Sequence, residues 1–252
     1  MYNFNILHQY LIKTKPQNMA SSIETTIGAR VANAEYLSTY LKGFKIFAPS
    51  DPALSGPELG ELIANIKAAN TETAAAIQHY STAIDARNKI FTEDVDSVKY
   101  VLSAIGATVR ASLGKTSKEA GNIAEMIHNL RGKTFKKSSK TPTEDSISQS
   151  ERSFGSLTQN FSAMITTLES FGGKYTPSNS AISIPALHIK LNLMGQSNIA
   201  VAAAYGPLKE KRDDRFVLYQ RLNILTQRIK DAVKSQYGLK STEYNLVKGL
   251  KV

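Results

Sequence analysis

The stretch FAPSDPALSGPEL at residues 47–59 returns as YTPSNSAISIPAL at residues 175–187, with Pro49 matching Pro177 and Pro57 matching Pro185. Other matches follow in the same order along the chain. TAAAI at 73–77 pairs with VAAAY at 201–205, RNKIF at 87–91 with RDDRF at 212–216, and VRASLGKTSKE at 109–119 with VKSQYGLKSTE at 233–243. An ordered series of landmarks that occurs twice predicts two divergent copies of one unit.

The separation between the copies is constant from FAPSD to TAAAI and then shortens by three positions before RNKIF. A loss of three residues inside a continuous helix would rotate the following residues by about 300° and spoil a buried face. The second copy also carries Gly206-Pro207, a pair that breaks helices. The pattern therefore predicts one turn near 79–82 and another near 205–207.

Apolar residues recur at intervals of three and four, the spacing of amphipathic helices. Each copy is predicted to hold three main helices and a short terminal helix. Gly114 and Gly238 are expected to end long helices in the left-handed conformation, and Ser117 and Ser241 to open the short ones. The predicted buried stripe of the third helix includes Phe91, Val95 and Val98 in the first copy and Phe216, Tyr219 and Leu222 in the second.

These patterns predict an all-α protein made of two tandem helical-bundle repeats. The expected boundaries are an N-terminal extension at 1–20, a first repeat at 21–131, a linker at 132–150 and a second repeat at 151–252. The extension is expected to be poorly ordered. The linker reads GKTFKKSSKTPTEDSISQS, which is polar and lacks helical periodicity.

The composition restricts the possible functions. The chain has 252 residues, of which 42% are hydrophobic, and this is enough for a real core. It has no cysteine, which excludes disulfides and thiolate metal sites. No apolar run approaches the roughly 18 residues that a membrane-spanning helix needs. We therefore expect a cytoplasmic protein without a membrane span.

Catalytic and metal-binding signatures are missing from the sequence. The four histidines are far apart, and neither a phosphate-binding loop nor a nucleophile elbow is present. The acidic run Glu93-Asp94-x-Asp96 could suggest a divalent cation, but its position beside Phe91 and Val98 favours a solvated face. The sequence predicts a non-enzymatic protein with no cofactor and no metal.

Arg87 and Arg212 open the matching motifs RNKIF and RDDRF. One interpretation is a contact with an anion or a partner. The other is an arginine whose stem lies on the core and whose guanidinium pairs with a neighbouring carboxylate such as Asp85 or Asp214. The duplication favours the structural interpretation, because a repeat duplicates its scaffold before its function.

The net charge of +10 is concentrated in two regions. Residues 207–252 hold 11 basic and 5 acidic side chains, and residues 131–152 hold 6 and 3. Arg221 and Arg228 share a helix face, while Lys136 and Lys137 lie in the linker. These residues could contact a nucleic acid, an anionic lipid or another polyanion, or they could form a solvated basic face.

The landmarks resemble those of a family of tandem-repeat helical proteins from Bacteroidota, over residues 21–252. The shared elements are Tyr175-Thr-Pro-Ser-Asn, Arg87-Asn88, Arg212-Asp213, Tyr237-Gly238 with Ser241-x-Glu243-Tyr244, and the linker followed by Ser150 to Phe154. Asp213 and the N-terminal extension depart from the family pattern. The resemblance implies the helical fold and no particular activity, substrate or partner.

The expected function is therefore a non-enzymatic structural or protein-interaction module inside the cell. Tandem helices bury one face against each other and leave long polar faces for partners. The alternative is a basic helical protein that binds nucleic acid or another polyanion. A protein partner is expected but not identified by the sequence, and the oligomeric state is left open.

Overall fold

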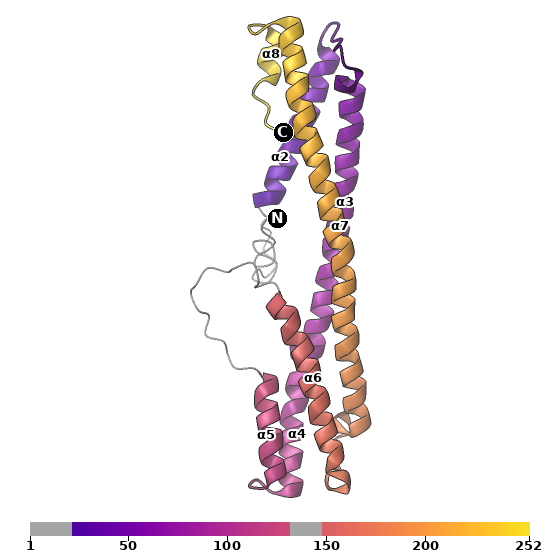
Figure 1. Cartoon of the computed structure of the whole chain (residues 1–252), viewed down its shortest axis with the longest axis vertical. Coiled ribbons are helices and arrows are strands. Elements are labelled where there is room, and N and C mark those ends of the chain that lie inside the picture. Colours follow the sequence, from indigo (N-terminus) through magenta and orange to yellow (C-terminus); the bar gives the residue numbers. More distant parts are fainter. Residues whose placement is uncertain (1–21, 132–147) are drawn as a thin grey trace. The chain divides into compact units, whose positions relative to one another are not determined.

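The computed structural model of the chain describes residues 22–131 and 148–252 (Figure 1). These two ranges contain helices and turns and no β-strand, which confirms the prediction of an all-α protein. The predicted N-terminal extension, 1–20, lies outside the described residues. So does the predicted linker, apart from residues 148–150, which belong to a helix.

The described helices vary widely in length. In chain order they are α2 (Ser22–Gly43), α3 (Gly56–Asn88), α4 (Val98–Leu113), α5 (Lys118–Arg131), α6 (Ser148–Ser170), α7 (Ile184–Tyr237) and α8 (Thr242–Val247). The connections contain the 3₁₀ turns η1 (Pro52–Leu54), η4 (Gly172–Lys174) and η5 (Ser180–Ile182), and the π-helical turn η2 (Lys89–Glu93).

Most predicted helix ends are confirmed. Pro57 and Pro185 are the second residues of α3 and α7, where a missing N–H costs little. Gly114 and Gly238 have φ values of 89° and 93°, which favour glycine. Beyond them, the hydroxyl groups of Ser117 and Ser241 accept backbone N–H bonds from the first turns of α5 and α8, each at 3.1 Å.

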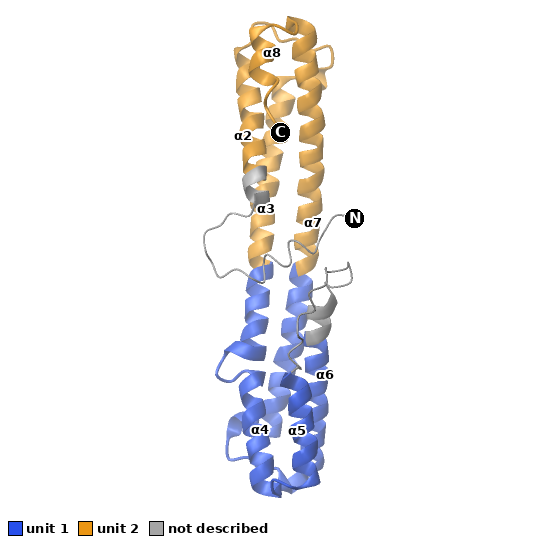
Figure 2. Ribbon diagram, turned by 90° about the vertical axis from the view of Figure 1, so that its left-hand side faces the viewer, with its two compact units in different colours: residues 1–15, 80–204 blue, residues 16–79, 205–252 orange. Residues whose placement is uncertain are grey.

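The chain forms two compact units, and each takes segments from both predicted repeats (Figure 2). Unit 1 contains described residues 80–131 and 148–204, and unit 2 contains 22–79 and 205–252. The units therefore do not follow the predicted boundaries of 21–131 and 151–252. Both α3 and α7 contribute residues to both units.

Each unit has its own hydrophobic core. The core of unit 1 is formed by α4, α5, α6 and the first part of α7, with Phe161, Met164 and Leu168 fully buried. The core of unit 2 is formed by α2, the first part of α3 and the last part of α7, and it is closed by Val247 of α8. Leu37, Leu59 and Ile229 are fully buried there.

The two predicted turns near 79–82 and 205–207 are wrong. Helix α3 continues to Asn88, and α7 runs through Pro207 without interruption. These are nevertheless the places where each helix passes from one core to the other, at 79/80 and 204/205. The local sequence signal marks a change of packing partners. It does not mark a change in the direction of the chain.

A strict seven-residue repeat explains why both helices continue. In α7 the buried residues Leu187, Met194, Val201, Leu208, Leu222 and Ile229 are separated by seven residues or a multiple of seven. In α3 the buried residues Leu59, Ile66, Thr73, Tyr80 and Arg87 follow the same rule. A heptad repeat keeps one seam of a helix against its neighbours over its whole length. Packing along this seam offsets the roughly 3 kcal/mol that an interior proline costs.

The heptads also favour a different alignment of the two predicted copies. Heptad positions in α3 and α7 keep the separation of Leu59 from Leu187 as far as Phe91, whose counterpart is Tyr219, and both rings are buried. The motif match had paired Phe91 with Phe216, which is 53% exposed. On this alignment, the four extra residues of the predicted first copy lie after Phe91, in η2 and the turn before α4, where Val95 is 91% exposed. The predicted burial of Val95 and Phe216 is wrong.

Because each unit needs segments from both sides of the linker, cutting the linker should leave the protein assembled. We expect a chain with an engineered protease site between Ser139 and Lys140 to remain one species after cleavage. Size-exclusion chromatography with light scattering checks this. Helicity and the urea midpoint should change little at micromolar concentration. Two separate helical fragments would contradict the finding that each unit is built from segments on both sides of the linker.

Candidate interaction surface

The last part of α7 has a sharply divided surface. Leu222, Leu225, Ile229 and Val233 face the core of unit 2 and are buried. Val217 and Ile224 lie on another side of the same helix and are 60% and 61% exposed. Single exposed apolar side chains are normal on a protein surface, but these two lie seven residues apart on one stripe of the helix, which makes the stripe a candidate contact surface.

Four residues define this surface, called the α7 face below: Val217, Arg221, Ile224 and Arg228. They are spaced by four, three and four residues and therefore form one stripe. Each follows a buried or half-buried position of the core by two residues, which is about 200° around a helix. All four side chains are exposed. The stripe alternates aliphatic and guanidinium groups.

Arg228 has a partner within unit 2. Its Nη2 lies 2.6 Å from Oδ2 of Asp51. Asp51 is the N-cap of η1, and its Oδ1 accepts the N–H of Ala53 at 2.9 Å. The Ala53 N–H and the Arg228 guanidinium hold the pKa of Asp51 below its usual value of 3.8. Arg228 therefore fixes the loop between α2 and α3 to α7 while it remains half-exposed.

Arg87 lies in the core of unit 1 instead. Its side chain is 5% exposed, and its guanidinium carbon lies 3.9 Å above the centroid of the Phe154 ring. Phe154 in turn packs edge-on against Phe91, with centroids 4.8 Å apart. The buried guanidinium thus stacks on an aromatic ring, a contact that the sequence did not predict and that is typical of a structural arginine.

The six predicted contact residues do not converge on one site. Arg221 and Arg228 share the α7 face, whereas Arg87 is buried in unit 1 and Arg212 is half-buried in unit 2. Lys136 and Lys137 lie outside the described residues. The heptad spacing matches Arg87 with Arg215, whereas the sequence motifs matched it with Arg212.

Two half-buried asparagines were missed by the motif search. Nδ2 of Asn70 donates to the Tyr219 hydroxyl at 3.0 Å in unit 2, and Nδ2 of Asn198 donates to Oγ1 of Thr158 at 3.1 Å in unit 1. Arg30 adds a bond to the Tyr219 carbonyl at 3.1 Å and lies over the Tyr219 ring. Asn70 and Asn198 have the same separation as Leu59 and Leu187, so a search for polar residues at the predicted repeat separation would have found them.

Two further titratable groups of unit 1 each make a single polar contact. Nε2 of His188 lies 2.7 Å from Oε1 of Glu169 on the surface of unit 1. The Tyr175 hydroxyl donates to the Ile182 carbonyl at 2.8 Å, and its burial raises its pKa to about 12. Among the described residues, no three side chains of the metal-binding types are grouped together. No described helix is long and apolar enough to cross a membrane.

Comparisons with protein-family models, with curated proteins and with solved structures found no match to this chain. The assignment of a function therefore depends on the surfaces and contacts described above.

The contact between Arg87 and Phe154 should be measurable as a coupling energy. We expect a double-mutant cycle with Arg87→Met and Phe154→Leu to give about 0.5–2 kcal/mol, because the stacked guanidinium is buried. Urea unfolding supplies the four free energies. Arg87→Met with Phe171→Leu is the matched control and should be additive, since Phe171 lies more than four helical turns further along the chain. Coupling of the same size in both cycles would contradict the stacking.

Two substitutions of Asp51 can separate the contribution of its helix cap from that of its ion pair with Arg228. Asp51→Asn keeps the capping oxygen, as Asn179 does for η5, whereas Asp51→Ala removes both interactions. We expect both variants to lower the thermal midpoint at pH 7, Asp51→Ala by more. Because the pKa of Asp51 is lowered on folding, its ionised form contributes stability above about pH 4 that is lost as the pH falls further. The difference between the wild type and Asp51→Asn should therefore shrink in acid, and a difference independent of pH would refute the ion pair.

Proposed function

We propose that this chain is a non-enzymatic helical module that binds a protein partner through the α7 face. The observation that carries the proposal is the pair Val217 and Ile224, 60% and 61% exposed, two helical turns apart and interleaved with Arg221 and Arg228. The proposal places the module inside the cell, in keeping with a chain that has no cysteine.

The physical support is the low cost of forming a complex on this face. Helix α7 is held by buried heptad residues on one side, so its backbone does not have to be ordered on binding. Burying the two aliphatic side chains would contribute about 1.5–3 kcal/mol each if they became fully covered. Arginine is enriched among the residues that dominate binding energy, because it combines an apolar stem with five directed donors.

Polyanion binding is the second candidate, and several basic groups of unit 2 are already engaged with carboxylates. Nζ of Lys209 lies 2.9 Å from Asp213, and Nζ of Lys211 lies 2.8 Å from Glu72. Arg228 is paired with Asp51. Each of these pairs neutralises a charge that a phosphate would otherwise meet. The neighbouring aliphatic side chains add nothing to phosphate binding, so the protein-interaction role is favoured.

We further infer that the two halves of the chain are divergent copies that exchange their C-terminal parts. Equivalent landmarks have equivalent local structure, since Asp51 and Asn179 cap η1 and η5 in the same way. The helix α4 with α5 and the end of α7 with α8 then correspond to each other across the two units. This inference supports a scaffold role, because such an exchange ties both units to the same two long helices.

The proposed function predicts that Val217→Glu with Ile224→Glu abolishes partner binding without loss of helicity. Binding would be measured by affinity capture from the native cell at physiological salt after nuclease treatment, with quantitative comparison between variants. Loss of two central contacts should weaken a specific complex by about 2–4 kcal/mol, which is a thirtyfold change or more.

The matched control is Ile189→Glu with Ile199→Glu. These side chains belong to the same helix, are 64% and 69% exposed, and lie in unit 1. A partner lost from both variants alike, or retained by both, would refute the α7 face. Binding of a short duplex DNA at physiological salt that is weakened by Arg221→Gln, but not by Val217→Glu, would favour the polyanion alternative instead.

A further inference from the structure

One end of unit 2 exposes aliphatic side chains from two different loops. Residues 42–48 include the end of α2 and the residues after it, and residues 234–240 include the end of α7 (Figure 1). Ile46 in the first segment is 84% exposed, and Leu239 in the second is 63% exposed. These two segments are called the tip below. The tip shares no residue with the α7 face.

The backbone of the tip is held in an unfavourable conformation. Ile46 has a φ of 62° and is the one residue other than glycine with a positive φ among those described. This conformation is a genuine outlier for a β-branched residue. In the loop after α6 of unit 1, the residue with a positive φ is Gly172. Ile46 therefore carries a conformational cost that a glycine at the same position would avoid.

Hydrogen bonds from the end of α7 maintain this conformation. The side chain of Gln236 donates to the Ile46 carbonyl and accepts the N–H of Ala48, the latter at 3.1 Å. The Tyr237 hydroxyl donates to the Lys45 carbonyl at 2.9 Å. The two loops are thus fastened together, and the Ile46 side chain is directed away from the protein.

The aromatic rings of the tip lie on the inner side. Phe44 and Tyr237 pack edge to face with centroids 5.7 Å apart, and both are partly buried against the core of unit 2. The outer side is therefore aliphatic. Aliphatic side chains insert among lipid chains, whereas binding of single-stranded nucleic acid relies on exposed aromatic rings that stack with bases.

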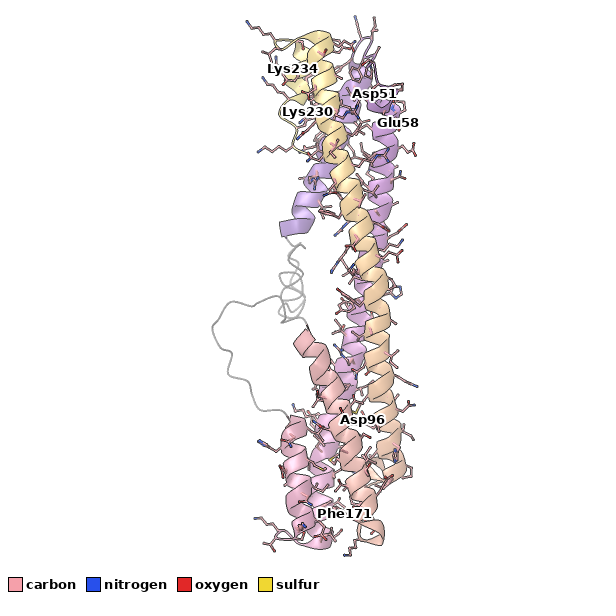
Figure 3. All side chains as sticks on the ribbon, in the orientation of Figure 1. Asp51, Glu58, Asp96, Phe171, Lys230 and Lys234 are labelled. Atoms are coloured by element: carbon pink, nitrogen blue, oxygen red, sulfur yellow. The ribbon has the colours of Figure 1, made fainter. Side chains whose placement is uncertain are left out.

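The tip is also strongly basic. Lys42, Lys45, Lys234 and Lys240 all carry their charge at the surface, and the two segments contain no acidic residue (Figure 3 labels Lys234). Burial of its hydroxyl raises the pKa of Tyr237, and the nearby carboxylate of Glu243 adds to this shift. Lysines near helix C-termini also complement the helix dipole, so their charge alone would not identify a partner. The combination of these lysines with exposed aliphatic side chains points to a partner that is both anionic and apolar.

We propose that the tip of unit 2 docks onto anionic lipid surfaces, with Ile46 and Leu239 inserted between headgroups and the four lysines facing lipid phosphates and carboxylates. Two short side chains give weak insertion by themselves, so attachment requires both the apolar and the electrostatic contributions. Each lysine near an anionic surface strengthens binding by roughly fivefold, and this effect falls with added salt. The proposal is independent of the α7 face.

The test uses the full chain in a flotation assay, with vesicles of pure phosphatidylcholine or of two parts phosphatidylcholine to one part phosphatidylserine. We expect binding to the mixed vesicles only. Lys45→Gln with Lys240→Gln should reduce the partition coefficient by about tenfold or more. Ile46→Gly should reduce it severalfold while raising the thermal midpoint, because glycine relieves the backbone strain. A rise in stability together with a loss of binding is not expected of a residue that serves folding alone.

Ile189→Ser with Ile199→Ser is the matched control, since it removes equally exposed aliphatic groups elsewhere on α7 and should leave partitioning unchanged. The proposal fails if the wild type does not prefer anionic vesicles. It also fails if Ile46→Gly with Leu239→Ser binds them as well as the wild type. Displacement from vesicles by duplex DNA, with the Ile46→Gly variant behaving like the wild type, would assign the tip to polyanions in general. If the Ile46 variants unfold, the lysine variants decide the outcome by the same tenfold criterion.

Discussion

The heptad seam shared by α3 and α7 is the constraint on which the rest of the structure depends. Both helices keep a seven-residue repeat of core positions while they pass from one unit to the other. In unit 2 they run antiparallel, as the contacts of Asn70 with Tyr219 and of Glu72 with Lys211 show. In unit 2 this pair packs with α2 and α8, and in unit 1 α7 packs with α4, α5 and α6. The seam of α7 thus supplies part of both cores.

Polar residues on this seam and beside it limit how the helices can align. Thr73 donates to the carbonyls of Ala69 and Lys211, while Asn70 and Asn198 each donate one bond. The Oδ1 atoms of both asparagines are buried and accept no bond within the described residues. Such groups cost stability relative to leucine. A shift of one heptad would separate each donor from its acceptor, so these residues favour one register over its alternatives.

Local signals predicted the helix ends well, because a cap depends on a few neighbouring residues. Gly114, Ser117, Pro57 and their counterparts behave as the sequence indicated. The continuity of α3 and α7 was not predicted, because the turns were placed from the sequence similarity of RNKIF and RDDRF and not from the spacing of the core positions. The composition of each unit, with segments from both sides of the predicted linker, was not predictable from either motif, since it depends on which helices meet in space. The exposure of Ile46 depends on hydrogen bonds from a segment far away in the sequence, at Gln236.

Position in the heptad, rather than residue type, decides which arginines can meet a partner. Arg87 occupies a core position and is buried against Phe154, although its motif suggested an anion contact as readily as a structural one. Arg221 and Arg228 each follow a core position by two residues and therefore face outward. The same rule separates Leu222, which is fully buried, from Ile224, which is 61% exposed. Because α7 is continuous, its core residues fix the orientation of the outer stripe, and the surface available for binding is set by the same repeat that builds the fold.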